Sequence, residues 1–295
     1  MAGVRPHISF SEKKLWDVCQ WRWMREVREK RYSNEESIHF SFGTSIHKCF
    51  EIYKDPKADD RPSPEQLEIL FEEDFRNRFA KVRGKLIEQG LAKDDNELSE
   101  EEIEKQTDGL SEELVVAGRR IVGHIDSLPE LRDARVLFVE HKLFEKIDRS
   151  DDIDVKFKGY IDVGLVLKDK RGKDILWIVD YKTCSWGWPR EKLSDPKILE
   201  QLRLYKHFLC KKFGLDYSAV RTAYILLKRK PQKDDQPIEW VPISSGSKTT
   251  IRAVTSLNRA VTGMNANDYK KNRDACIDRW GHKCPLLDTP LCEKD

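Results

Sequence analysis

The chain has 295 residues, of which 36% are charged and 39% are apolar, and its 54 Lys and Arg residues nearly balance 52 Asp and Glu residues. Apolar segments recur from end to end, which excludes a disordered polyampholyte, and the length suffices for one large domain with a sizeable core. No apolar run approaches the ~18 residues of a membrane span, and the N-terminus lacks the apolar core of a signal peptide. We therefore expect an intracellular, cytoplasmic protein without membrane contact, whose seven cysteines are thiols or metal ligands and not a disulfide framework.

The first part of the chain is predicted to be helical. Ser11 is the expected N-cap of the first helix, in which apolar residues repeat every fourth position. The predicted helices cover 11–31, 41–54, 64–90 and 99–126.

Strands follow, and turn-forming residues between the first three favour an antiparallel meander. A helix that ends at Gly214 separates these three from two more strands, and a final helix precedes a tail with little periodicity. The predicted strands cover 134–147, 154–168, 173–184, 219–230 and 238–243, and the two helices cover 195–214 and 247–268. This order predicts an α+β protein.

An acid and a base stand two residues apart in the strand-like stretch IVDYKTC, residues 178–184. Asp180 and Lys182 therefore share one face of the strand, and Tyr181 points to the other. If this strand pairs with the preceding one, Asp162 comes close to Asp180, and two close carboxylates repel unless a cation lies between them. Mg²⁺ or Mn²⁺ suits such oxygen ligands, and a lysine beside the ion can orient a water or stabilise charge on a phosphate.

Each of these features also has an ordinary explanation. Asp180 and Lys182 could form a surface ion pair, and a helical histidine such as His47 is often structural. Gln201 and Tyr205 are four residues apart and could belong to the polar face of an amphipathic helix. The apolar run before Asp180 favours a central strand over an exposed one.

Taken in order, four segments resemble the motif series of RecB-type nucleases in the PD-(D/E)XK superfamily. That series reads G-x-x-x-H, G-x-(I/V)-D, D-x-K and Q-x-x-x-Y, and the matching segments are Gly43–His47, Gly159–Asp162, Asp180–Lys182 and Gln201–Tyr205. The resemblance implies a restriction-endonuclease-like core, with a central mixed sheet flanked by helices. We expect one domain over 1–295, with a helical insertion over 60–130, a catalytic sheet core over 134–245 and a cysteine-bearing tail over 269–295 that packs on the N-terminal helix.

The resemblance also implies a role for each matching residue. Lys182 would position or activate the attacking water, and Gln201 and Tyr205 would steady that lysine and the nucleic-acid strand. Glu140, on the strand before Asp162, is a further candidate for the same cleft. The implied ligands of Mg²⁺ or Mn²⁺ are His47, Asp162, Asp180 and the backbone carbonyl of Tyr181.

Four cysteines form a second candidate metal site. Three lie in the tail, with seven residues between neighbours, and the fourth lies in the first helix: Cys276, Cys284, Cys292 and Cys19. CRISPR-associated and helicase-linked relatives of the RecB type, and similar phage exonucleases, hold an iron–sulfur cluster with one N-terminal and three C-terminal cysteines. The resemblance therefore implies a 4Fe–4S cluster here. The relatives usually place the first two tail cysteines two residues apart, so a structural zinc ion or ordinary thiols are the alternatives.

Aromatic and basic residues follow the strand that carries Lys182. Trp186, Trp188 and Arg190 could stack on bases and contact phosphates, although packed aromatics and a solvated surface are ordinary alternatives. The prediction is a metal-dependent DNA nuclease that by resemblance acts as an exonuclease on single strands or DNA ends, and a phage origin agrees with it. The alternatives are a non-catalytic DNA-binding or assembly subunit of a recombination or helicase–nuclease complex, and an RNA-directed nuclease. The chain has no G-x-x-x-x-G-K-(S/T) loop, so a helicase would be a separate partner.

Overall fold

A six-stranded mixed sheet forms the centre of the computed structural model, which describes residues 6–31, 37–93, 99–148, 154–232, 235–267, 269–277 and 283–292. The strands are β1 (His7–Ser9), β2 (Arg135–Lys146), β3 (Lys156–Lys168), β4 (Asp174–Cys184), β5 (Val220–Lys228) and β6 (Ile238–Ile243). β2, β3 and β4 pair antiparallel, which confirms the predicted meander.

β4 lies between β3 and β5, as expected of a strand entered through an apolar run. β5 runs parallel to β4, because α7 (Arg190–Ser194) and α8 (Pro196–Phe213) connect the two strands and carry the chain back. Gly214 caps α8 in the left-handed conformation, with φ of 63°, as the sequence predicts. The Asp180–Lys182 segment therefore belongs to an inner strand with a helix packed on it.

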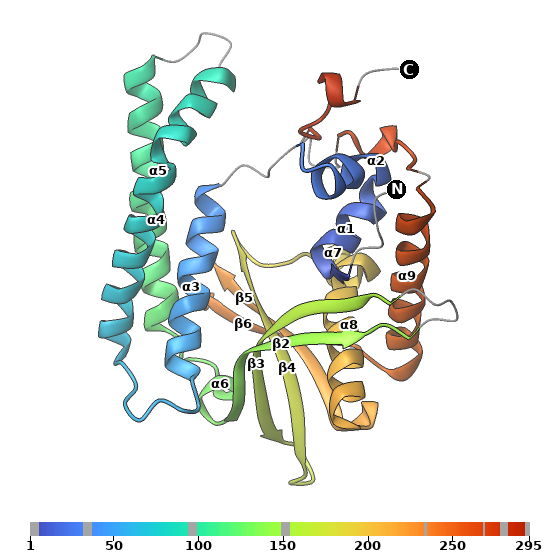
Figure 1. The fold of residues 1–295 in the computed structure, drawn as a ribbon. Coiled ribbons are helices and arrows are strands. Elements are labelled where there is room, and N and C mark those ends of the chain that lie inside the picture. The colour runs from blue at the N-terminus through green and yellow to red at the C-terminus, as the bar shows by residue number, and fades with distance from the viewer. Residues whose placement is uncertain are drawn as a thin grey trace.

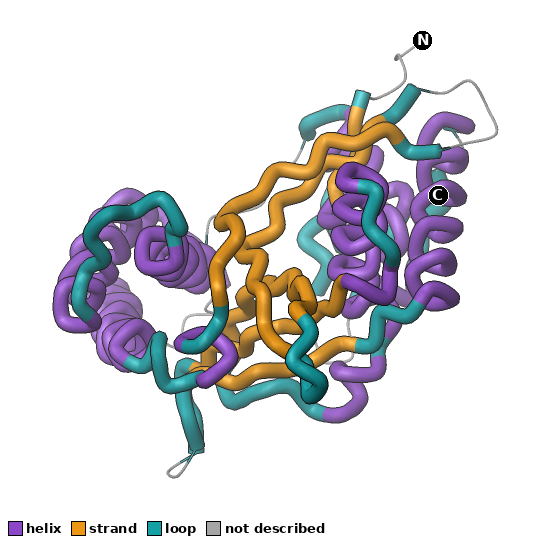
Figure 2. The backbone as a smooth tube through the Cα atoms, turned by 90° about the horizontal axis from the view of Figure 1, so that it is seen from below, coloured by secondary structure: helices purple, strands orange, loops and turns teal. Residues whose placement is uncertain are grey.

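Helices cover both faces of the sheet (Figures 1 and 2). The helices α3 (Ile38–Lys54), α4 (Pro64–Lys93) and α5 (Glu100–Gly123) cover one face. Their buried core there includes Phe42, Phe71 and Phe75. The short α6 (Pro129–Arg132) leads from these helices into β2. The other face buries α8, α9 (Ser247–Ala266) and the N-terminal helix. No helix in the described part of the chain is both long and apolar enough to cross a membrane.

The N-terminal segment is not one helix, so the prediction of a single helix over 11–31 is wrong. It divides into α1 (Phe10–Val18), α2 (Gln20–Trp23) and a π-helical turn over Met24–Arg28, because the backbone of Cys19 is extended. Ser9, and not Ser11, caps α1: its side chain accepts a hydrogen bond from the Glu12 N–H, and the Glu12 carboxylate accepts one from Ser9. The spacing of apolar residues alone fits a continuous helix and does not predict this break. Because of the break, the Cys19 side chain faces a cavity that tail residues also line.

The C-terminal tail packs on α1 and α2. The Trp21 indole donates a hydrogen bond of 2.8 Å to the Leu291 carbonyl, and the Asn272 amide donates one of 2.9 Å to the Val18 carbonyl. The cationic groups of Arg25 and Lys271 also lie over the Trp21 ring, at 4.5 and 4.9 Å from its centroid. These contacts attach the described part of the tail to α1 and α2.

Candidate active site

Three carboxylates lie in a row across three neighbouring strands. The β2–β3 register places Glu140 across from Asp162, and the β3–β4 register, continued by one residue, places Asp162 across from Asp180. Glu140 has a φ of 44°, close to a register shift in β2, and a non-glycine residue in this region stores backbone strain. The sheet therefore gathers three acidic groups where mutual repulsion opposes their approach.

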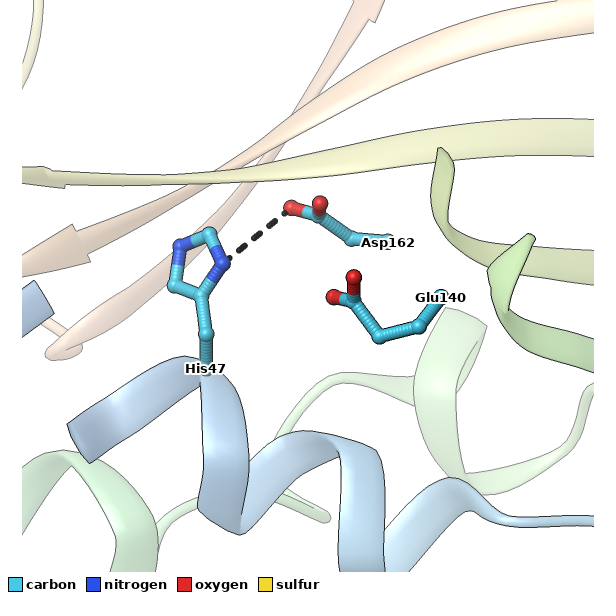
Figure 3. Close-up of side chains that lie close together, drawn as sticks. All are labelled: His47, Glu140 and Asp162. Atoms are coloured by element: carbon cyan, nitrogen blue, oxygen red, sulfur yellow. Dashed lines mark ion pairs between the residues drawn. The ribbon is translucent and has the colours of Figure 1, made fainter. Parts of the chain in front are cut away.

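His47 completes a group that could bind a cation (Figure 3). Ligand atoms of His47, Glu140 and Asp162 all lie within 4.8 Å of one another. The His47 Nδ1 lies 3.5 Å from the Asp162 Oδ2, and the Glu140 carboxylate points toward the same space (Figure 3). One imidazole and two carboxylates form a suitable donor set for a divalent cation such as Mg²⁺ or Mn²⁺.

Tyr181 links this group to β4 through its backbone. Its N–H donates a hydrogen bond of 2.7 Å to the Asp162 Oδ2, and its backbone also hydrogen-bonds with His47. The phenol ring points away from Asp180 and packs against Phe50 of α3, with centroids 4.8 Å apart. The Tyr181 backbone thus lies beside His47 and Asp162. The resemblance implies that its carbonyl is a metal ligand together with these two side chains.

Asp180 and Lys182 share the opposite face of β4 and meet α8. The Lys182 ammonium lies 2.6 Å from the Asp180 Oδ2, and the Gln201 amide donates a hydrogen bond of 2.8 Å to the Oδ1. The same amide donates one of 3.0 Å to the Tyr205 hydroxyl, one turn later on α8. Asp180 is 2% exposed and lies outside the group of His47, Glu140 and Asp162. Its direct partners are Lys182 and Gln201, so Asp180 positions the lysine.

Burial and like charge shape the ionisation of these groups. Burial raises the pKa of Asp162 well above its usual value, and the negative charge of Asp180 raises it further. Burial likewise raises the pKa of Glu140 and lowers that of His47. Burial alone would lower the pKa of Lys182, but the charges of Asp180 and Asp162 outweigh it and raise that pKa. The set favours additional positive charge, as a divalent cation would supply.

Glu140 is the residue that sequence reasoning weighted least. Acids on strands are common at solvent-facing positions, and no motif marks this one. Only its position opposite Asp162 could identify Glu140, because a hairpin between β2 and β3 must place one residue of β2 across from Asp162. That residue is identified only when the register is known, since a slip by one position turns the side chain to the other face.

Two glycines of the matched motifs have different surroundings. A Cβ added to Gly159 would lie 2.6 Å from the Tyr205 ring, whereas one added to Gly43 would lie 3.6 Å from Thr183, an ordinary contact. We expect Gly159→Ala to displace the Tyr205 ring, to destabilise the protein by about 1–3 kcal/mol and to reduce cleavage. Gly43→Ala is the matched control, with a small effect on stability measured by thermal unfolding. Equal tolerance at both positions would contradict the close packing of Tyr205 on β3.

Two open clefts flank the end of β4. One has a volume of about 810 Å³ and includes Lys182, Gln201 and Trp188 in its wall. The other, of about 700 Å³, lies mainly between α5 and the segments that follow β4 and β5, and includes Trp186, which is 67% exposed. The two tryptophans of the loop after β4 therefore line different clefts. Arg190 is exposed at the start of α7 and lines neither of them.

The four cysteines named from the sequence line one small cavity between α1, α2 and the tail: Cys19, Cys276, Cys284 and Cys292. The Cys284 N–H donates a hydrogen bond of 2.6 Å to the Cys276 carbonyl. Burial raises the pKa of the Cys276 thiol, and the other three thiols raise it further. The remaining cysteines lie elsewhere: Cys49 and Cys210 are buried in helices, and Cys184 ends β4.

A family model described as the PD-(D/E)XK nuclease superfamily matches residues 7–288. The chain therefore belongs to the PD-(D/E)XK nuclease superfamily, which confirms the predicted superfamily and the predicted mixed-sheet fold. Membership implies metal-dependent nuclease activity on nucleic acid, and the His47, Glu140 and Asp162 group is a candidate site for the metal. No curated protein matched the chain in a comparison with such proteins.

Proposed function

We propose that this protein is a DNA nuclease of the RecB type that depends on Mg²⁺ or Mn²⁺ and acts as an exonuclease on single strands or DNA ends. The observation that carries the proposal is the placement of Lys182 and Asp180 next to the His47, Glu140 and Asp162 group, with an open cleft at Lys182. A phosphate in that cleft would meet the Lys182 ammonium group, and the candidate cation ligands lie on the neighbouring strands β2 and β3 and on α3.

The proposed reaction is hydrolysis of a phosphodiester bond. The oxygen of a water forms a bond to phosphorus, the bond from phosphorus to a sugar oxygen breaks, and that oxygen gains a proton. A divalent ion, when bound, would polarise the phosphate and lower the pKa of the water. His47, Asp162 and Glu140 would hold the ion, and the Tyr181 carbonyl and Asp180, both beside this group, would complete the proposed ligand set.

Lys182 supplies positive charge at the phosphate and not a free amine. Asp180 and Asp162 raise its pKa, so the side chain holds its proton at neutral pH. A protonated lysine donates hydrogen bonds, which suits it to orient the water and to stabilise charge that develops on the phosphate oxygens. Gln201 fixes the Asp180 carboxylate, which in turn fixes the lysine, and Tyr205 fixes Gln201.

The choice of DNA, of single strands and of an exonuclease mode rests on the RecB-type resemblance. Exposed Trp186 and cleft-lining Trp188 support it, because aromatic faces bind single strands through base stacking. Arg190 belongs to the same proposal as a weaker contact. A cytoplasmic location, a single domain and a separate helicase or recombination partner would accompany this role.

The decisive experiment is cleavage of end-labelled single-stranded DNA, double-stranded DNA and RNA with Mg²⁺, Mn²⁺ or EDTA. The wild type is compared with Asp180→Ala. We expect cleavage of DNA that needs the metal and is lost in the variant, and the product ladder would give the polarity. Cleavage of RNA alone would favour the RNA-directed alternative. A folded wild type that binds DNA but cuts nothing under any metal would favour the non-catalytic subunit.

We also propose that Cys19, Cys276, Cys284 and Cys292 hold a 4Fe–4S cluster. The observation that supports this proposal is that all four cysteines line one cavity. The choice of a 4Fe–4S cluster over a zinc ion rests on the RecB-type resemblance. The cluster would attach the tail to α1.

If the cluster is present, protein purified without oxygen is expected to be brown and to contain iron. Cys284→Ser should bleach the protein and lower its melting temperature, whereas Cys49→Ser, at a buried thiol outside the cavity, should keep the colour. Colourless wild type that contains zinc and no iron would support the zinc alternative. Colourless, metal-free and stable wild type would support ordinary thiols.

A further inference from the structure

The larger cleft extends from Lys182 along α1, which belongs to none of the matched catalytic motifs. Residues of α1 and α2 form one wall, and residues of β4, α7 and α8 form the other. Figure 1 shows α1 and α7 next to each other. Its cationic lining residues come from both walls: Lys14, Arg22, Lys182, Lys192 and Lys197. The cleft is thus a continuous path from the candidate active site to the N-terminal helices.

The two acidic residues that line the cleft offset only part of this positive charge, because they are fewer than the five cationic residues. Glu26 lies 2.5 Å from the Arg22 guanidinium on the same helical segment. Glu12 accepts the Ser9 N–H in the capping box of α1. Lys192 lies over the Trp188 ring, 4.4 Å from its centroid, where an aromatic and a cation are presented together. The lining therefore keeps a surplus of positive charge, as an anionic backbone would require.

Buried contacts fix α1 beside this path. Lys13 is 0% exposed and forms ion pairs with Asp17 at 2.5 Å and with Glu200 of α8 at 2.7 Å. Glu200 directly precedes Gln201, so the same turn of α8 holds both α1 and Asp180. The next residue, Lys14, is exposed on the side of α1 that lines the cleft. A buried ion pair thus orients its neighbour toward Lys182.

Lys14 lies close enough to Lys182 for the two positive charges to repel each other. In the part of the chain that the structure describes, no carboxylate lies within 4.0 Å of its ammonium group, although Asp195 attracts it from farther away. Partial burial lowers the pKa of Lys14, and the charge of Lys182 lowers it further. Two ammonium groups that repel each other in a cleft are both stabilised when an anion lies between them.

We propose that Lys14 binds a phosphate of the substrate strand next to the one at Lys182, so that α1 is part of the nucleic-acid interface. This inference rests on the proposed nuclease function. It assigns α1 a role in holding the strand in the cleft between α1 and α8, with Lys182 at the reacting phosphate. Lys14 would contribute to affinity and to the position of the strand, and not to the bond cleavage itself.

The test measures binding of a fluorescent single-stranded oligonucleotide by anisotropy, with EDTA present to prevent cleavage, at several salt concentrations. Lys14→Ala and Lys14→Glu are compared with wild type and with Lys14→Arg. Lys85→Glu on α4 is the control, because Lys85 is also an exposed lysine and lies outside the cleft. Each phosphate contact with a single strand contributes about 0.7 to the slope of log affinity against log salt. Removing one contact should reduce the slope by that amount.

We expect Lys14→Ala to weaken binding by about 3- to 10-fold at low salt. The ratio of wild-type to variant affinity should fall by about 2.5-fold between ~50 and ~200 mM salt. Lys14→Glu should weaken binding further, Lys14→Arg should restore it, and in cleavage assays KM should rise more than kcat falls. Wild-type affinity and salt slope in a folded Lys14→Glu protein that still cuts DNA would overturn this inference and leave the proposed function intact. A wild type that neither binds nor cuts would overturn both.

Discussion

Lys182→Ala is expected to reduce the rate constant for cleavage by at least about 100-fold, while affinity for single-stranded DNA changes by only a few-fold. Lys182 is the cation that Asp180 holds at 2.6 Å, and the open cleft reaches it. Charge on the phosphate oxygens rises as water attacks, so loss of this ammonium affects the transition state more than the bound state. Affinity is expected to depend on several cationic residues of the cleft, of which Lys182 is one.

Single-turnover cleavage with saturating enzyme measures this effect, because it separates the chemical step from binding. Lys85→Ala is the control for removal of an exposed lysine. Lys182→Arg keeps the charge but changes the geometry of donation, so it should recover part of the rate at most. Cleavage at the wild-type rate by folded Lys182→Ala would remove this residue from the catalytic site.

Much of the sheet could be predicted because its strands carry unambiguous local patterns. The strand predicted over 173–184 is observed over Asp174–Cys184, and the one predicted over 154–168 is observed over Lys156–Lys168. Apolar runs between turn-forming residues identify such strands, and period-two alternation places Asp180 and Lys182 on one face. The same pattern explains why Tyr181 packs against α3 while its two neighbours meet α8.

Features that depend on long-range contacts could not be predicted in this way. The extended backbone of Cys19 interrupts a segment with good helical spacing, and the contacts that accompany the break come from the tail more than 250 residues later, including Asn272 to Val18. The position of Glu140 depends on strand register, and that of Lys14 on a buried ion pair between α1 and α8. Local sequence patterns contain no direct information about any of these contacts.

Asp162→Asn is expected to stabilise the metal-free protein and to abolish both cleavage and stabilisation by Mn²⁺. Burial and the negative charge of Asp180 oppose ionisation of Asp162, and the amide removes that charge. An asparagine oxygen can still accept the Tyr181 N–H, which Asp162 accepts at 2.7 Å, so the local structure should persist. In wild type, a ligand at about 100 times its Kd stabilises the folded state by about 2.7 kcal/mol, and the variant should lose most of that gain.

The pH dependence of this effect has a defined sign. The folded pKa of Asp162 is raised above its unfolded value of about 3.9, so its contribution to stability is complete below that value and is lost as pH rises through the folded pKa. In EDTA, the stability of wild type relative to Asp162→Asn should therefore fall from about pH 4 toward neutral pH. Denaturant unfolding at several pH values measures this difference, with the exposed Asp59→Asn as control. A variant that is less stable than wild type at neutral pH in EDTA, with metal stabilisation retained, would show that Asp162 supports the fold and does not bind the metal.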